Sequence, residues 1–324
     1  MITVAVLSYN GKHHLDDCLR SLARQSYRDM EVLLVDNGST DGTPEYVKEI
    51  FPWVRLVILS KNCGVTGGLN ACVRFAQGEY VALLNNDVEV DENWLGYLHE
   101  TISADKSIAA CDSKIFYFDD RDRIWTSGAD YSIAGTTNGR WARQTDQGEF
   151  QRSADVFVAC GCAAIYRKSV FDDIGLFDED FFMGYEDVDW SFRAHLRGYR
   201  IVNAPASRVY HKVSSTTGEN SFCYVYNGQR NVSAVFIKNM PAPLLIRYLP
   251  LHLIYIGGSM MYFLKIGRGL AFFQAKWELL KQLPVLWRKR RQIQKQRRVS
   301  SAEIDSLLDR NWLKSKLDKV KGSS

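Results

Sequence analysis

Three carboxylates stand within four residues, at Glu186, Asp187 and Asp189. Carboxylates this close repel one another, so at least one of them should have a raised pKa and be able to take a proton, as a general base does. Acidic residues at the start of a helix also complement the helix dipole, so a structural role fits the same pattern. The segment is therefore a candidate for proton transfer, with dipole complementation as the alternative.

A second polar group, Asn85, Asn86 and Asp87, ends an apolar run. One carboxylate with amide oxygens beside it suits a hard cation such as Mg²⁺ or Mn²⁺, and a bound diphosphate would supply the remaining ligands. His211 follows another apolar segment and could add a neutral ring nitrogen. The alternatives are an ordinary turn after a strand and a structural histidine.

Asp36 directly follows the apolar residues 32–35. A carboxylate in that position could accept a hydrogen bond from the imide N–H of a uracil- or thymine-type base, or from a ribose hydroxyl. The sequence DNGS at 36–39 is also good turn chemistry, because Asp and Asn side chains bond to nearby backbone N–H groups. A nucleotide contact and a structural turn both fit at this point.

The elements that must position these residues alternate between strand and helix in the first 90 residues. Short apolar runs predict strands at 2–7, 31–35, 54–59 and 80–84, and helical patterns lie between them at 14–25, 43–51 and 67–76. Repeated β-α units of this kind predict a parallel, doubly wound sheet. Each strand ends in a polar or Gly-rich turn, and ligands of such sheets bind beyond the carboxyl ends of the strands. A site at that edge is therefore expected.

The chain from residue 91 onward is less regular. We expect helices at 94–103 and 187–197, a helical turn at 169–173, a loop-rich stretch at 119–155, strands at 156–166 and 200–203, and an apparent strand at 207–211. Gly198 is a usual residue for ending the second of these helices.

The last part of the chain has a different composition. Residues 238–324 hold 18 basic and 5 acidic residues, whereas the whole chain has a formal net charge of only +4. An apolar stretch at 244–264 contains an arginine, a proline, a histidine and two glycines, and a basic run at 288–298 follows it. Apolar and aromatic faces next to dense cations are typical of a segment that lies on an anionic membrane surface. A core helix with a solvated basic tail, and a true membrane span, are the alternatives.

The overall composition excludes several classes of protein. The 324 residues are 46% hydrophobic, which rules out intrinsic disorder. The seven cysteines are scattered, and Cys160 and Cys162 are too close to form a usual zinc pair, so we expect reduced thiols and a reducing compartment. The first residues carry no basic and apolar leader of a secretory signal, and run directly into the first predicted strand.

Five sequence blocks, taken in order, resemble the family 2 glycosyltransferases, which are inverting enzymes with the GT-A fold. The blocks are VAVLSYN at 4–10, LLVDNGSTDG at 33–42, NCGVTGGLN at 62–70, LLNND at 83–87 and GLFDEDFFMGYEDVD at 175–189. The resemblance is greatest to bacterial rhamnosyltransferase-type members that build cell-surface polysaccharide. It covers residues 1–237, and it implies a nucleotide-binding half at 1–90, an acceptor half at 91–237 and a helical tail at 238–324.

The resemblance also implies a role for each candidate residue. Asp187 matches the general base of the family's acidic pair, and Glu186 would orient the acceptor or a neighbouring cation. Asp87 matches the last carboxylate of the metal-binding DXD motif, in which this chain has Asn85 at the first position. His211 matches a position that completes the metal shell in some members. The residues expected to line the donor nucleotide are Ser8, Asn10, Asp36, Asn62, Gly68 and Asn86.

The implied reaction moves a sugar, with rhamnose from dTDP-rhamnose as the best match, to a glycan or polyprenyl-diphosphate-linked acceptor, with Mg²⁺ or Mn²⁺ as cofactor. The implied location is the cytoplasmic face of the membrane, with the tail on the anionic lipid surface. A non-catalytic nucleotide-sugar binder or scaffold, and a nucleotidyltransferase, are the competing interpretations. No GxGxxG follows the first strand, which disfavours a dehydrogenase, and no base-reading element suggests nucleic acid.

Overall fold

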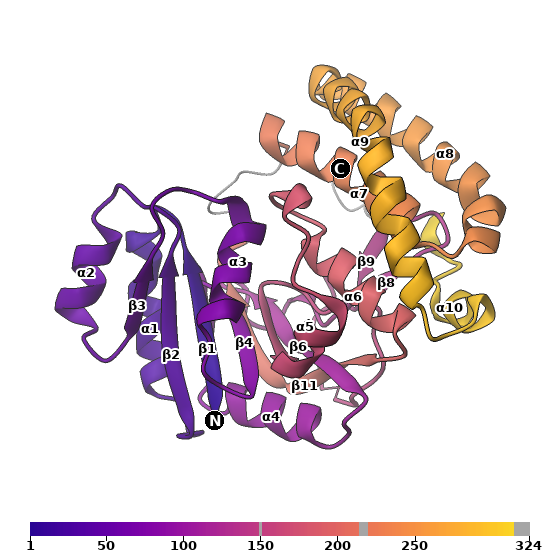
Figure 1. Cartoon of the computed structure of the whole chain (residues 1–324). Helices are drawn as coiled ribbons and strands as arrows, with labels where there is room; N and C mark the ends of the chain where they lie inside the picture. Colours follow the sequence, from indigo (N-terminus) through magenta and orange to yellow (C-terminus); the bar gives the residue numbers. More distant parts are fainter. Residues whose placement is uncertain (149–150, 214–219, 314–324) are drawn as a thin grey trace.

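The computed structural model describes residues 1–148, 151–213 and 220–313. It contains one large sheet with helices on both faces and a group of C-terminal helices packed against one side of it (Figure 1). The expected α/β class is confirmed.

Four parallel strands form the first half of the sheet. They are β1 (Ile2–Ser8), β2 (Met30–Asp36), β3 (Arg55–Ile58) and β4 (Tyr80–Asn85), in the spatial order β3-β2-β1-β4. Their register places Ser8 beside Asp36 and Leu7 beside Asn85. The four predicted strands are confirmed to within one residue at either end, and their polar carboxyl ends meet at one edge.

The second half of the sheet is mixed. It continues from β4 in the order β10-β6-β11-β5, formed by β5 (Val88–Val90), β6 (Ile108–Tyr117), β10 (Ala163–Arg167) and β11 (Arg200–His211). β10 runs antiparallel to both neighbours, β11 is parallel to β6, and β5 is antiparallel to β11. β7 (Ile124–Thr126) pairs with β6, while β8 (Ala129–Tyr131) and β9 (Thr137–Gly139) form a separate hairpin.

Helices cover both faces of this sheet. One face carries α1 (Leu15–Ala23), which follows the short 3-10 turn η1 (Lys12–His14), together with α2 (Thr43–Ile50) and α4 (Trp94–Ser103). The other face carries α3 (Gly64–Phe75), α5 (Lys168–Ile174) and α6 (Glu186–Leu196). Alternate residues of β1 serve the two cores, with Val4 and Val6 packed on the α1 side and Ala5 on the α3 side.

The predicted strand at 156–166 is wrong over most of its length, because the strand β10 begins only at Ala163. The backbone N–H groups of Cys160 and Gly161 donate to the carboxylates of Asp112 and Asp187, so they are not available to a strand ladder. The stretch 119–155, predicted to be loop-rich, contains the three short strands β7, β8 and β9.

Two further boundaries differ from the sequence prediction. The segments 200–203 and 207–211 form the single strand β11, interrupted by a register shift between Ala204 and Arg208. The helix predicted at 67–76 begins three residues earlier, at Gly64. Two asparagine side chains favour this early start, since Asn37 and Asn62 accept hydrogen bonds from the N–H groups of Cys63 and Gly64.

The C-terminal helices are α7 (Phe222–Asn239), α8 (Ala242–Lys265), α9 (Gly269–Gln296) and α10 (Ser301–Leu307). α9 packs against α7 and also contacts α8 (Figure 1). A third core joins these helices to the sheet domain, because Phe236 of α7 and Leu286 of α9 pack in one cluster with Phe157 and Phe192. Residues 314–324 of the tail lie outside the described residues.

Candidate active site

The carboxyl ends of β1 and β2 bring Ser8 and Asp36 side by side, and both are buried. Asp36 accepts a hydrogen bond from the backbone N–H of Ser39 through Oδ2 (3.0 Å). Its other oxygen, Oδ1, is buried and accepts no hydrogen bond from any described residue. A buried carboxylate oxygen without a donor is an acceptor held ready for a ligand N–H or O–H.

Asn10 joins the loops that follow β1 and β2. Its backbone has a positive φ of 49°, its N–H donates to Ser39 Oγ (2.8 Å), and its Oδ1 accepts from Thr40 N–H (2.8 Å). Asn is among the residues that tolerate this left-handed conformation best. Asn10 therefore fixes the shape of the wall around Asp36 by bracing two loops.

Asn62 and Gly68 shape the other wall. Asn62 Oδ1 accepts from Gly64 N–H and from Asn37 Nδ2 (3.2 Å), so it ties the loop before α3 to the loop after β2. A Cβ on Gly68 would lie 2.4 Å from Leu7 Cδ1, so the glycine allows α3 to pack closely on β1. Asn37, which we did not single out from the sequence, is the buried partner that completes this brace.

The polar end of β4 adjoins the same wall. Asn86 Nδ2 donates to Ser8 Oγ (3.0 Å), and Gly11 leaves room for that amide, since a Cβ there would lie 1.8 Å from Asn86 Nδ2. Asp87 Oδ1 lies 3.2 Å from His211 Nε2, and both side chains are buried. The tertiary structure thus joins two residues that are 124 positions apart in the sequence.

Asp87 and His211 could serve as two protein ligands of a divalent cation. Among the described residues, no group of three or more His, Cys, Asp and Glu side chains is arranged to hold a metal by itself. The carboxylate of Asp87 and the nearby imidazole of His211 form a pair, and His211 Nδ1 is buried without a hydrogen-bond partner in the described chain. Asn85 lies at the end of β4 beside them and offers an amide oxygen. A cation held here would take its other ligands from a bound diphosphate.

The acidic pair begins α6. Asp187 Oδ2 accepts from Gly161 N–H (3.0 Å) and its Oδ1 accepts from Val188 N–H (2.8 Å). Glu186 is buried, and its Oε2 accepts no hydrogen bond from the described residues. Burial, and then the charge of Asp187, raise the pKa of Glu186 to about 8. Burial also raises the pKa of Asp187, against the effect of its two backbone donors. Glu186 therefore keeps its proton at neutral pH more readily than an ordinary carboxyl group does.

A third carboxylate, Asp112 on β6, lies in the same region. The N–H of Cys160 donates to Asp112 Oδ1 (2.9 Å), and the next N–H along the chain, of Gly161, donates to Asp187. Burial raises the pKa of Asp112 well above its ordinary value, and the charge of Asp187 adds to the effect. We did not single out Asp112 from the sequence. The signal present in the sequence was a carboxylate that directly follows the apolar residues 108–111.

The strand-end site and the acidic pair are adjacent. Asn85 N–H donates to the carbonyl of Cys162 (2.9 Å), one residue after the N–H that holds Asp187. The segment 160–162 therefore connects the end of β4 to the start of α6. The structure brings together the two groups of residues that the sequence indicated separately.

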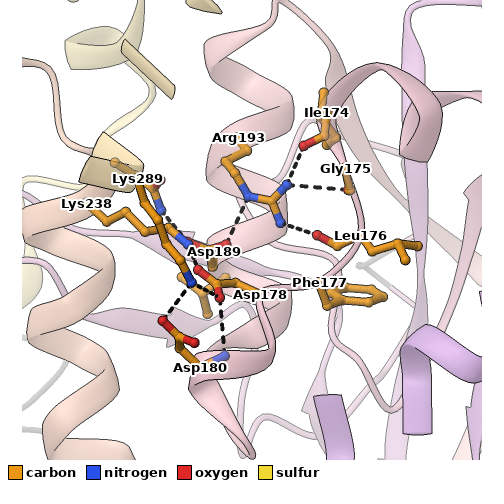
Figure 2. Close-up of polar contacts among 12 residues, drawn as sticks. Ile174, Gly175, Leu176, Phe177, Asp178, Asp180, Asp189, Arg193, Lys238 and Lys289 are labelled. Atoms are coloured by element: carbon orange, nitrogen blue, oxygen red, sulfur yellow. Dashed lines mark hydrogen bonds and ion pairs between the residues drawn. The ribbon is translucent and has the colours of Figure 1, made fainter. Parts of the chain in front are cut away.

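The segment just before the acidic pair is fixed by the C-terminal helices. Lys238 of α7 contacts Asp178 Oδ2 (2.5 Å) and Asp189 Oδ1 (2.7 Å), and Lys289 of α9 contacts Asp178 Oδ1 (2.5 Å) and Asp180 Oδ2 (2.6 Å) (Figure 2). Burial opposes ionisation of Asp178, but the two ammonium groups overcome it and hold the pKa of that carboxyl well below its usual range.

Hydrogen bonds to backbone carbonyls and one further ion pair complete this attachment. Asn231 Nδ2 lies within hydrogen-bond distance of the carbonyls of Phe181, Met183 and Gly184 (3.0, 3.0 and 2.7 Å). Arg193 of α6 donates to Asp189 and, through its other nitrogens, to the carbonyls of residues 174–176 (Figure 2). The acidic pair thus follows a segment bonded to both α6 and α7.

Comparison with known proteins gives consistent results. Residues 3–175 match the family model of Glycosyl transferase family 2. The chain is 27% identical over 243 residues to N-acetylglucosaminyl-diphospho-decaprenol L-rhamnosyltransferase of Mycobacterium tuberculosis, covering 68% of this chain and 78% of the relative. It is also 27% identical over 220 residues to poly-beta-1,6-N-acetyl-D-glucosamine synthase of Staphylococcus aureus, covering 67% of this chain and 51% of that protein.

Among solved structures, the mannosyltransferase PcManGT from Pyrobaculum calidifontis, in complex with GDP-Man and Mn²⁺, superposes with a TM-score of 0.55 at 18% identity. The match covers 90% of this chain and 86% of that one. At this level of identity the likeness shows a shared fold.

Proposed function

The chain belongs to glycosyl transferase family 2, and from this premise we propose that it transfers a sugar from a nucleotide-sugar donor with inversion at the anomeric carbon. The GT-A fold and the nucleotide-sugar-dependent transferase class follow from the family. The proposed mechanism rests on the position of Asp187 and Glu186, which begin α6 beside the polar strand ends.

The donor nucleotide binds at the ends of β1 and β2 in this proposal. The buried Oδ1 of Asp36 accepts a hydrogen bond from the base or the ribose, which would relieve its lack of a donor. Asn10, Asn62 and Gly68 act through the shape of the pocket, because their contacts brace its loops and pack α3.

The reaction needs a base, and Asp187 supplies it. An acceptor hydroxyl oxygen attacks the anomeric carbon in line, the bond from that carbon to the diphosphate oxygen breaks, and the hydroxyl proton passes to Asp187. Two backbone N–H groups hold the carboxylate in a fixed position. Glu186, which keeps its own proton, leaves the pair with a single negative charge and so avoids a second charge beside the donor diphosphate.

A divalent cation between Asp87, His211, Asn85 and the donor diphosphate would neutralise charge on the leaving group. Ser8 and Asn86 bond to one another next to this position and fix the ends of β1 and β4.

We further propose dTDP-rhamnose as the donor and a polyprenyl-diphosphate-linked glycan as the acceptor, in cell-surface polysaccharide synthesis at the cytoplasmic face of the membrane. The relative from M. tuberculosis, named as a rhamnosyltransferase of a diphospho-decaprenol substrate, supports this choice. An apolar acceptor of this kind would reach the enzyme from a membrane.

The surface of α8 and α9 supports membrane association. α8 is long and apolar enough to cross a membrane, the one such helix in the described chain. Exposed apolar residues recur at helical spacing along one face of each helix, which we call the hairpin face: Ile246, Leu253, Ile254, Met261 and Leu264 on α8, and Leu270, Phe273, Trp277, Leu280 and Trp287 on α9.

The opposite face of α8 is attached to the protein. His252 lies 2.8 Å from the carbonyl of Ala134 and 3.1 Å from Ser233 Oγ, and Tyr248 donates to Asp305 (2.6 Å). A helix held along one side in this way fits a position on the membrane surface better than a transmembrane one.

The first experiment measures release of nucleoside diphosphate from UDP-, dTDP- and GDP-sugars with Mg²⁺, Mn²⁺ or EDTA. The proposal expects release from one donor, lost with EDTA, in Asp87→Ala and in Asp187→Asn, and kept in the exposed control Asp172→Asn. Nucleotide binding without release in any condition, with or without added polyprenyl-linked acceptor, would favour a non-catalytic binder. No nucleotide binding at all would contradict the proposal.

A second experiment tests membrane association with vesicles. Deleting residues 240–324 should release the protein, but it would also uncover the core around Phe157 and Phe192, because α9 packs there. Phe273→Ser/Trp277→Ser changes only exposed side chains of the hairpin face, and Trp53→Ser/Phe75→Ser changes exposed aromatic residues elsewhere. Only the first pair should weaken sedimentation with vesicles, and equal binding of both pairs would contradict the assignment.

A further inference from the structure

A pocket of about 390 Å³ lies between the start of α8 and the end of α9. Its lining is strongly basic and contains no carboxylate. The lining residues are Ala242, Pro243, Trp287, Arg290, Arg291, Gln294 and Arg297.

The arginines of this pocket differ from the neighbouring cations of the same basic run. Lys289 and Arg298 each have carboxylate partners, namely Asp178 and Asp180 for the lysine and Asp173 for the arginine. Arg290 donates to two backbone carbonyls and its guanidinium lies over the ring of Trp287, and Arg297 donates to a serine hydroxyl.

Arg291 is exposed and forms no ion pair with a described residue. The three guanidinium groups therefore gather in one hollow without a compensating charge from the part of the chain that the structure describes. Burial, and then the charge of Arg297, lower the pKa of Arg290, as expected of like charges brought together.

The first turn of α8 adds to this positive potential. The helix is 24 residues long, and no side chain caps its N-terminus at Pro241. The positive end of the helix dipole favours an anion there, although Pro243 in the first turn has no N–H group to donate. An arginine fork matches the oxygens of a phosphate in geometry as well as in charge.

The pocket also borders the hairpin face. Trp287 lines the pocket and is exposed as a member of that face, and the exposed Ile246 lies one helical turn after Ala242. An anion in this pocket would thus have apolar surface beside it. A charged head joined to apolar chains fits this combination better than a free ion does.

We propose that the arginine pocket binds the phosphate of an anionic lipid headgroup, and so fixes the position of the enzyme on the membrane surface. The inference rests on the proposed membrane association and adds a specific site to it. It separates two roles within the basic run: Lys289 and Arg298 attach α9 to the sheet domain, whereas Arg291 and Arg297 contact lipid phosphate.

The test uses the full chain and a short-chain phosphatidylglycerol below its micelle concentration, titrated by calorimetry. Arg291→Gln/Arg297→Gln removes two pocket cations and spares Arg290, which bonds to the end of α7. The matched control, Lys281→Gln/Arg288→Gln, removes two cations from the same helix outside the pocket. We expect the pocket variant to bind the lipid at least about ten-fold more weakly than the wild type, and the control to stay within about two-fold of the wild type.

A parallel titration with inorganic phosphate separates the possible sources of the anion. Binding of the lipid and of phosphate, both lost in the pocket variant, supports a site that recognises the phosphate alone. Binding of the lipid only supports a headgroup site that needs the attached glycerol and chains. No lipid binding by the wild type, or equal weakening in both variants, overturns the proposal.

The result can be separated from failure of the proposed function. Nucleoside diphosphate release is measured in the same preparations and should not change in either double variant. If the wild type fails to sediment with vesicles but still binds the soluble lipid through the pocket, the hairpin face is wrong as a membrane surface and the phosphate site stands.

Discussion

The acidic pair gives the most decisive prediction about the mechanism. Glu186→Gln replaces the side chain that holds the proton with one of the same shape that is always neutral. With a pKa of about 8, roughly nine in ten Glu186 side chains are already neutral at pH 7. The rate of donor turnover should therefore stay within about two-fold of the wild type at pH 7. Asp187→Asn removes the base itself and should lower the rate by about 10² to 10⁴.

The pH profile separates this explanation from a general loss of structure. Above pH 8 the wild-type Glu186 ionises and puts a second charge beside Asp187, so we expect kcat/KM for the donor to fall. At pH 9 only about one in ten side chains remains neutral. The Gln variant has no such group, and its activity should stay level where that of the wild type falls.

The assay is nucleoside diphosphate release from pH 6 to 10, with circular dichroism as a check of folding and calorimetry as a check of donor binding. If Glu186→Gln is as inactive at pH 7 as Asp187→Asn, Glu186 does not act as a neutral partner of the base. An identical alkaline decline in the wild type and the Gln variant would refute this role of Glu186 as well.

Three further predictions concern stability. Lys238→Met leaves buried carboxylates without one of their partners and should lower the free energy of unfolding in urea by about 3 kcal/mol. Lys289→Met should cost less, because the Lys289 side chain is 27% exposed and that of Lys238 only 2%. Equal costs of the two substitutions would contradict this ranking of the ion pairs. Gly68→Ala should lower the free energy of unfolding by about 1–3 kcal/mol, because the added Cβ clashes with Leu7. The loss should disappear when Leu7 is also replaced, in the Leu7→Ala background. A loss that persists there would show that this contact between α3 and β1 is not its cause. Between pH 4.5, the ordinary pKa of Glu186, and about 8, the folded protein keeps a proton on Glu186 that the unfolded chain loses. The free energy of unfolding of the wild type, relative to that of Glu186→Gln, should therefore fall as the pH rises across this window. Parallel stability curves of the two proteins would exclude the raised pKa.

Local patterns were enough to predict the first half of the fold. The strands β1 to β4 are short apolar runs, each followed by a polar turn, and the sheet places those turns at one edge. The periodicity that buries a strand lies within a few residues, so it can be read without knowing its neighbours. Asp36 and Asp87 could be selected for the same reason, because Asp36 directly follows such a run and Asp87 follows one after two asparagines.

The second half of the sheet depends on partners that are distant in the sequence. β10 joins β4 to β6 in antiparallel fashion, and its start is set by Asp112 and Asp187, which take the N–H groups just before it. Asp112 could not be selected from the sequence for the same reason, because its partners are distant in the sequence. Its carboxylate follows a short apolar run, but this local pattern does not show which distant segment the side chain contacts, and its hydrogen bond to Cys160 does.

The family, the α/β class and the candidate acidic pair could all be predicted from the sequence, since each depends on residues that lie close together along the chain. The tertiary structure alone decided how the basic run is used. Lys289 meets Asp178, which lies 111 residues earlier, whereas Arg291, two residues later, has no carboxylate partner in the described chain. Neighbouring cations cannot be told apart from the sequence, because the sequence gives the charge of each side chain but not the partner that it meets. Whether each charge is neutralised depends on what folding brings within a few ångströms of it.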